Sequence, residues 1–127
     1  MNQPKAVKIK IDGRVISKKN SKQIFRNRYT GAPFIKSSDA YAGFGDDALR
    51  QLQTCQACFF GKVRIDYVFE IKGQMRIDVD NAMASINDIL QKAGVIDDDN
   101  NVVKGSFEKV NGMNDWTTYV EISKVIQ

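Results

Sequence analysis

Histidine is absent from this sequence of 127 residues, and cysteine and proline occur only twice each. Without histidine, the chain cannot form a Ser-His-Asp or Cys-His nucleophile, a histidine-ligated zinc site or a histidine pH switch. Two cysteines are too few for the disulfide framework of a small secreted domain. Any chemistry must therefore rely on carboxylates, basic side chains, hydroxyl groups or the two thiols.

Long apolar runs are missing too. The first ten residues, MNQPKAVKIK, lack the apolar core of a signal peptide, and no segment approaches the length that spans a membrane. With 43% hydrophobic and 27% charged residues, the composition is typical of a globular protein, and 127 residues are enough for one domain with its own core. We therefore expect a single domain over residues 1–127 that acts in the cytoplasm and has no membrane partner.

The net charge of +4 conceals two opposed parts of the chain. Residues 1–36, the basic arm, contain ten basic residues and one acid, which gives +9 and leaves −5 for the remainder. Such an arm indicates a polyanionic partner, although a solvated cationic face is an equally simple interpretation. The candidate phosphate-binding residues are Lys18, Lys19, Lys22, Arg26, Arg28 and Arg76.

Hydropathy periodicity predicts an α+β fold with a mixed sheet. Residues 17–38 are a basic loop or loosely paired hairpin, and Asn111-Gly112 predicts a turn that joins the last two strands into a C-terminal β-hairpin. Apolar alternation marks the strands, and 3.6-residue spacing marks two main helices. The expected strands are 6–13, 62–72, 102–110 and 116–125, and the expected helices are 38–60 and 81–93.

Aspartates cluster on both sides of the second predicted helix. If residues 76–80 are extended, Asp78 and Asp80 project from the same side. If the chain folds back along the helix, Asp97–Asp99 meet them, and such an all-oxygen group suits Mg²⁺ or Mn²⁺. A bound metal ion supports phosphodiester hydrolysis without histidine. The alternative is that the first pair caps the helix and the later acids fill a solvated turn.

The segment 76–103, RIDVDNAMASINDILQKAGVIDDDNNVV, resembles the RusA family of Holliday junction resolvases, which are small phage and prophage endonucleases. The resemblance covers the Asp-x-Asp-Asn element, the helix length, Lys-Ala-Gly and the interval from Asp80 to Asp99. It implies a homodimer that binds four-way DNA junctions and makes paired symmetric nicks with Mg²⁺ or Mn²⁺, in recombination and repair near the nucleoid. The implied catalytic and metal-binding residues are Asp78, Asp80 and Asp99, with Asp98 as an adjacent metal-binding acid.

One position departs from the pattern of the family. Its best-known member has a functionally important lysine four residues after the second aspartate, and this chain has Ala84 there. Either Arg76, Lys92 or a lysine of the basic arm replaces that lysine, or the chain is slower or differently selective. The change bears on turnover rate and cleavage preference, and it leaves the predicted metal binding unaffected.

Other interpretations compete with this one. Asp97 to Glu108 imitates an EF-hand calcium loop, but the position that needs glycine is Val102, and the sequence beyond it is strand-like. A non-catalytic nucleic-acid-binding module with structural acids would also use the basic arm, because phosphate contacts alone account for affinity. A nuclease differs from such a module in cutting DNA only when a divalent metal is present.

The cysteines and the late aromatic residues have simple structural explanations. Cys55 and Cys58 have CxxC spacing without the second pair that zinc requires, so we expect two half-buried free thiols on one face of a helix. Aromatic residues at alternating strand positions could stack on bases, but they more often belong to a core. These residues are Phe107, Trp116 and Tyr119.

Overall fold

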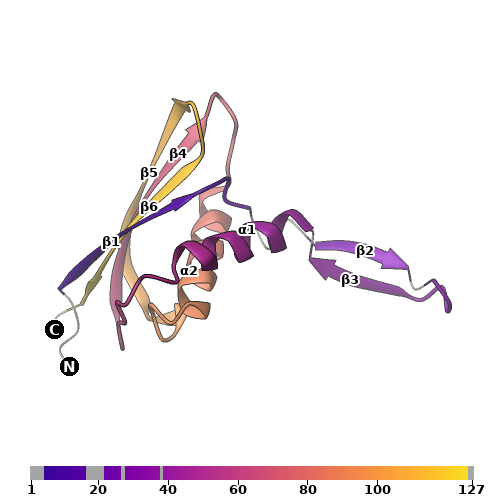
Figure 1. Ribbon diagram of the computed structural model, residues 1–127, viewed down its shortest axis with the longest axis horizontal. Helices are drawn as coiled ribbons and strands as arrows, with labels where there is room; N and C mark the ends of the chain where they lie inside the picture. Colours follow the sequence, from indigo (N-terminus) through magenta and orange to yellow (C-terminus); the bar gives the residue numbers. More distant parts are fainter. Residues whose placement is uncertain (1–4, 17–21, 27, 38, 126–127) are drawn as a thin grey trace.

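The computed structural model describes residues 5–16, 22–26, 28–37 and 39–125. Its main body is a four-stranded sheet with two helices packed on one face, and a separate two-stranded hairpin projects beyond the start of the first helix (Figure 1). The class is α+β, as predicted. The elements are β1 Ala6–Asp12, β2 Lys22–Arg26, β3 Pro33–Ser37, α1 Asp39–Gln51, β4 Val63–Lys72, α2 Val79–Lys92, the 3₁₀ turn η1 Asp99–Asn101, β5 Val102–Met113 and β6 Thr117–Lys124.

The sheet is organised around β4, its most apolar strand. The strand order is β1-β6-β4-β5, with β4 parallel to β5 and antiparallel to β6. Alternate residues of β4 are buried against the helices, because side chains two apart in a strand face the same side. These residues are Val63, Ile65, Tyr67, Phe69 and Ile71.

The predicted C-terminal hairpin is wrong, because β5 and β6 do not pair with each other. β4 lies between them, so the Asn111-Gly112 segment leads across the end of β4 instead of into a neighbouring strand. The physical reason is that α2 connects β4 to β5 as a crossover, which makes these two strands parallel. The last strand then covers the other edge of β4 and completes the burial of this apolar strand.

Helix α2 begins at Val79, two residues before the predicted start, and ends at Lys92, one residue before the predicted end. Asp78 is the N-cap, and Gly94 after the helix has a φ of 78°, a left-handed conformation that glycine adopts without strain. Its buried face packs on the sheet through Ala82, Ser85, Ile86, Ile89 and Leu90. On the same side of the sheet, burial raises the pKa of Tyr67 to about 12, and its protonated hydroxyl donates a hydrogen bond to Asn87 of α2.

Helix α1 ends at Gln51, nine residues before the predicted end, so the expected helix over 38–60 is too long. Phe59 explains the difference: its backbone N–H donates to the carbonyl of Val95 at 2.8 Å, and it forms a parallel bridge with Ile96. The side chain of Phe59 is fully buried, so tertiary packing overrides local helix propensity here. Cys55 and Cys58 are free and half-buried, as predicted, but they lie outside any helix.

The hairpin expected within residues 17–38 is present as β2 and β3, which pair antiparallel from Lys22 opposite Ser37 to Arg26 opposite Pro33. It extends away from the body of the protein (Figure 1). Lys18 and Lys19 of the basic arm lie outside the described residues. Within the described part of the chain, no helix has the length and apolarity needed to cross a membrane.

At Gly105 of β5, the backbone lies very close to the parallel strand β4. A Cβ atom at this position would lie 1.8 Å from the backbone oxygen of Ile65 in β4, so Gly105→Ala must push the strands apart. We expect the free energy of unfolding to fall by about 3 kcal/mol, measured by urea denaturation. The matched control is Gly43→Ala in α1, where nothing lies within 4 Å. That change should leave stability unchanged or raise it by about 0.5–1 kcal/mol, and an equal loss in both variants would contradict the close approach.

Candidate functional site

The first two candidate acids lie at the start of α2. The Asp78 side chain accepts hydrogen bonds from the backbone N–H of Asn81 at 3.4 Å and from its side-chain amide at 3.0 Å. Asp80 lies in the first turn of the helix, and both aspartates are exposed. The predicted extension of residues 76–80 is wrong from Val79 onward, because capping by Asp78 starts the helix there. Both carboxylates nevertheless face solvent at one end of α2.

The other acids lie at the opposite end of α2. After Gly94, the chain turns back under the helix, where the N–H of Val95 donates to the carbonyl of Leu90 at 2.9 Å. The backbone N–H of Asp99 donates to Oε1 of Gln91 at 2.8 Å. Gln91 was not among the residues singled out from the sequence. It anchors the acidic loop to the last turn of the helix.

Within the acidic loop, the three aspartates have different partners. Asp97 accepts hydrogen bonds from the N–H of Gly61 and from the side chain of Asn101, at 3.3 Å and 2.7 Å, so it connects the loop to the segment before β4. Asp98 caps η1 through the N–H of Asn100 at 2.9 Å. Asp99 is exposed. Asp97 therefore has a structural role, and Asp99 is more available for an ion.

One chain does not bring the two ends of α2 together. Gln91 lies eleven positions after Asp80, which corresponds to about 16 Å along a helix. Bonds from Mg²⁺ or Ca²⁺ to oxygen are only about 2.0–2.6 Å long. Among the described residues, no group of three or more histidine, cysteine, aspartate or glutamate side chains is arranged to hold a metal ion. A site that combines Asp78 and Asp80 with Asp99 therefore stays a prediction, and it needs a second chain or a rearrangement.

The donor chemistry of the candidate acids fits a hard divalent cation. Carboxylate oxygens are the ligands that Mg²⁺ and Mn²⁺ prefer. The ion pairs formed by described residues use other aspartates, so no described cation forms an ion pair with any of the four candidate acids. Exposed, uncompensated carboxylates at both ends of α2 are suited to binding a metal ion from solution.

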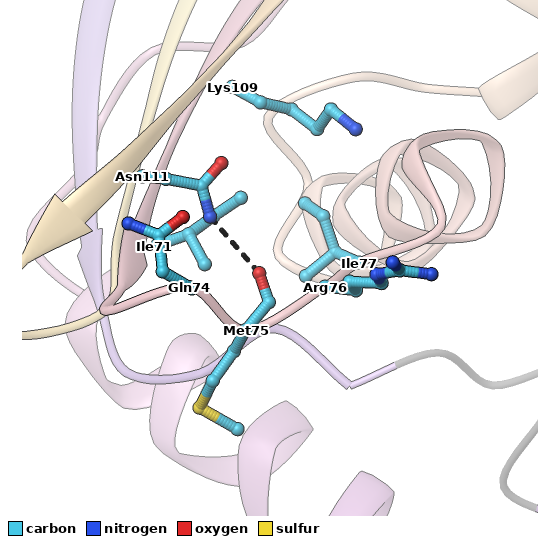
Figure 2. A pocket seen from close by; sticks show the side chains of 7 residues that line it. All are labelled: Ile71, Gln74, Met75, Arg76, Ile77, Lys109 and Asn111. Carbon is cyan, nitrogen blue, oxygen red and sulfur yellow. Dashed lines mark hydrogen bonds between the residues drawn. The ribbon is translucent and has the colours of Figure 1, made fainter.

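Basic side chains gather beside the start of α2 in a cavity of about 580 Å³. Figure 2 shows Arg76 and Lys109 at its wall, together with Asn111 and the turn that follows β4. Arg76 is two residues before the N-cap and is exposed, which fits its predicted role near phosphates. Lys109 was not predicted as a site residue, because its position on β5 becomes relevant only through the pairing of β5 with β4.

Comparison with known families matches residues 46–123, more than half of the chain, to the family described as Endodeoxyribonuclease RusA. The chain belongs to the RusA family. It is therefore an endodeoxyribonuclease of the Holliday junction resolving type, and branched DNA junctions are the substrate of this family. The match includes all four candidate acids but begins after the basic arm. A comparison with curated proteins finds no match.

In this RusA-family chain, the structure bears on two earlier alternatives, the EF-hand loop and the replacement of the absent lysine by Lys92. The EF-hand interpretation fails, because β5 begins at Val102 where a second helix would have to follow. Lys92 forms an ion pair with Asp88 at 3.0 Å, one turn earlier on α2, and lies at the far end of the helix from Asp80. Within one chain, Lys92 is therefore too far from Asp80 to replace the lysine that is absent at Ala84.

The prediction that the late aromatic residues belong to the core is wrong for two of them. Phe107 is 54% exposed on β5, an edge strand, and Tyr119 is 39% exposed on the sheet face that the helices leave open. Trp116 is half-buried, with the Arg14 guanidinium 5.2 Å from its ring centroid. On the sheet face that the helices leave open, a hydrogen bond from Arg64 lowers the pKa of Asp66, and a hydrogen bond from Ser106 lowers it further.

Proposed function

We propose that this RusA-family endonuclease resolves four-way DNA junctions as a homodimer, by paired symmetric nicks that require Mg²⁺ or Mn²⁺. The observation that carries the proposal is the distribution of exposed acids, with Asp78 and Asp80 at one end of α2 and Asp98 and Asp99 at the other. A two-fold axis across the middle of α2 would bring the first end of one helix to the second end of its partner. Two equivalent sites would result.

The surface midway between the two acid clusters supports this arrangement. Met83 of α2 and Val103 and Phe107 of β5 line a cavity of about 450 Å³ between the helix and the edge strand. Val103 and Phe107 are 47% and 54% exposed, which is unusual for large apolar side chains on a strand. A second copy of the chain would bury this patch, and self-complementary contact is what a two-fold interface requires.

In the proposed site, Asp78 and Asp80 of one subunit and the partner subunit's Asp99 would hold the metal ion, with Asp98 close by. When bound, the ion would activate water and offset charge on the scissile phosphate. The side chain of Asn81 orients Asp78, and Gln91 holds the backbone of Asp99, so each end of the site is fixed before DNA binds. No histidine is needed for this chemistry.

The basic arm would carry the DNA outside the cleavage site. The β2–β3 hairpin projects from the body (Figure 1). Arg28 and Tyr29 near its turn are exposed, Tyr29 by 91%. Lysine and arginine in this region would neutralise phosphates, and the tyrosine offers a ring on which a base could stack. We also propose that the domain extends over residues 1–127, because β1 forms one edge of the same sheet although it precedes the matched range.

A synthetic four-way junction tests the proposed activity. We expect the purified chain to cut opposed strands of the junction in Mg²⁺ or Mn²⁺, to leave a linear duplex of the same sequence intact, and to lose activity in EDTA. Gel analysis with each strand labelled in turn would reveal symmetric cuts. Binding of the junction without cutting in either metal would contradict the proposal and favour a non-catalytic binding module.

Replacing Lys18 and Lys19 with alanine should weaken junction binding and flatten its salt dependence. Each lost phosphate contact lowers the slope of log K against log salt by about 0.9, so the double variant should lose about 2 from the slope. The measurement is junction affinity in Ca²⁺ at several salt concentrations. The matched control replaces Lys104 and Lys124, two exposed lysines of the sheet that lie outside the basic arm. An unchanged slope for the first variant would place the DNA path elsewhere.

A further inference from the structure

The cavity beside the start of α2 is built around a rigid turn. The side chain of Asn111 in β5 donates hydrogen bonds to the carbonyls of Met75 at 3.1 Å and Gly73 at 3.4 Å, and Figure 2 shows the first of these. The backbone N–H of Gly112 also donates to the carbonyl of Gly73 at 2.7 Å. These contacts fix the segment that carries Arg76, two residues before Asp78. The position of Arg76 relative to the candidate acids is therefore determined by β5.

Lys109 lies on the helix side of β5. It pairs in register with Phe69, and Phe107 pairs with Tyr67, whose side chain hydrogen-bonds to α2. Because residues in register in a parallel pair face the same side, Phe107 and Lys109 both face α2. β5 runs parallel to β4, and α2 runs antiparallel to both strands. Lys109, two residues after Phe107, therefore lies nearer to the start of α2. Figure 2 shows the side chains of Lys109 and Arg76 extending toward α2 from the same cavity.

The two cations of this cavity have no anionic partner within the described part of the chain. No ion pair formed by described residues uses Arg76 or Lys109. Both side chains are exposed, and both border the helix end that carries Asp78 and Asp80. A pair of free cations next to carboxylates that bind a metal is suited to a phosphodiester, whose oxygens can contact the ion and the cations together.

We infer that Lys109, together with Arg76, holds a phosphate of the DNA strand that is cut, and that Lys109 positions this strand at the metal site. The inference rests on the proposed function. Ala84 lies one turn after Asp80 on α2 and leaves that face of the helix without a cation. Lys109 supplies the charge from the neighbouring strand, so that the site has its positive group although none is present at position 84.

The variant Lys109→Ala tests this role. We expect the single-turnover rate of junction cleavage, measured with enzyme in excess, to fall about 10- to 100-fold. Junction affinity in Ca²⁺ should fall less than about fivefold, with a salt slope reduced by about 0.9, because one phosphate contact of many is lost. Lys109→Arg should restore most of the cleavage rate, and Lys109→Gln should not, since the charge is what the role requires.

Lys104 provides the matched control. It is an exposed lysine of the same strand, but it pairs in register with Arg64 and lies on the sheet face away from α2. Lys104→Ala should cut at the wild-type rate. If the wild-type chain cuts junctions and Lys109→Ala cuts equally fast, the role of Lys109 is refuted while the proposed function stands. An Lys109→Arg variant as slow as Lys109→Ala would also refute it, whereas a wild-type chain that cuts no junction refutes the proposed function itself.

Discussion

Asp80→Asn should abolish junction cleavage and leave junction binding intact. Asparagine has nearly the shape of aspartate, but it removes one negative charge from the proposed metal site, so we expect the cleavage rate in Mg²⁺ to fall at least about 100-fold. Asp80 is exposed in the first turn of α2, where loss of the charge should cost only about 0.3–1 kcal/mol of stability. Cleavage of a labelled four-way junction and its affinity in Ca²⁺ are the two measurements.

The control for this variant is Asp46→Asn, an equal change at an exposed aspartate of α1. It should cut at the wild-type rate, which separates loss of a ligand from a general change in net charge. If Asp80→Asn also cuts at the wild-type rate, the proposal that carboxylates hold the metal is wrong. If it fails to bind the junction, Asp80 is needed for folding or DNA contact instead.

Features that depend on neighbours in the sequence could be predicted. β4 alternates without interruption, so its apolar face follows from the two-residue period of a strand. α2 has an apolar stripe, an aspartate cap and a glycine after its end, and these signals agree on where the helix lies. The candidate acids were chosen from their local spacing around this helix and from the family resemblance, and their role stays a prediction.

Features that depend on long-range pairing could not be predicted. The turn signal at Asn111-Gly112 gives no information about which strand lies beside β5, so the hairpin expected from it did not form. Phe59 pairs with the segment after α2, and no periodicity near Phe59 could reveal this. Lys109 is an ordinary strand lysine until β5 pairs with β4 and faces the start of α2.

Two inactive variants should restore each other if each site takes acids from both subunits. In a heterodimer of Asp80→Asn and Asp99→Asn chains, one site would carry both substitutions and the other would carry neither. We expect each homodimer to be inactive. In a 1:1 mixture about half of the dimers are mixed, and each of these has one intact site, so up to about one quarter of all sites should be active. Because a mixed dimer has a single working site, the junction should be nicked in one strand and not resolved.

The same experiment with Asp80→Asn and Asp78→Asn chains is the decisive control. These two aspartates lie at the same end of α2, so each site of the mixed dimer would lack one of them and no activity should return. Recovery in the first mixture and none in the second requires that the two ends of α2 contribute to one site from different subunits. No recovery in either mixture, although tagged chains co-purify as mixed dimers, would mean that each site lies within one chain. The acidic loop would then have to move about 16 Å toward Asp80, a distance set by the length of α2.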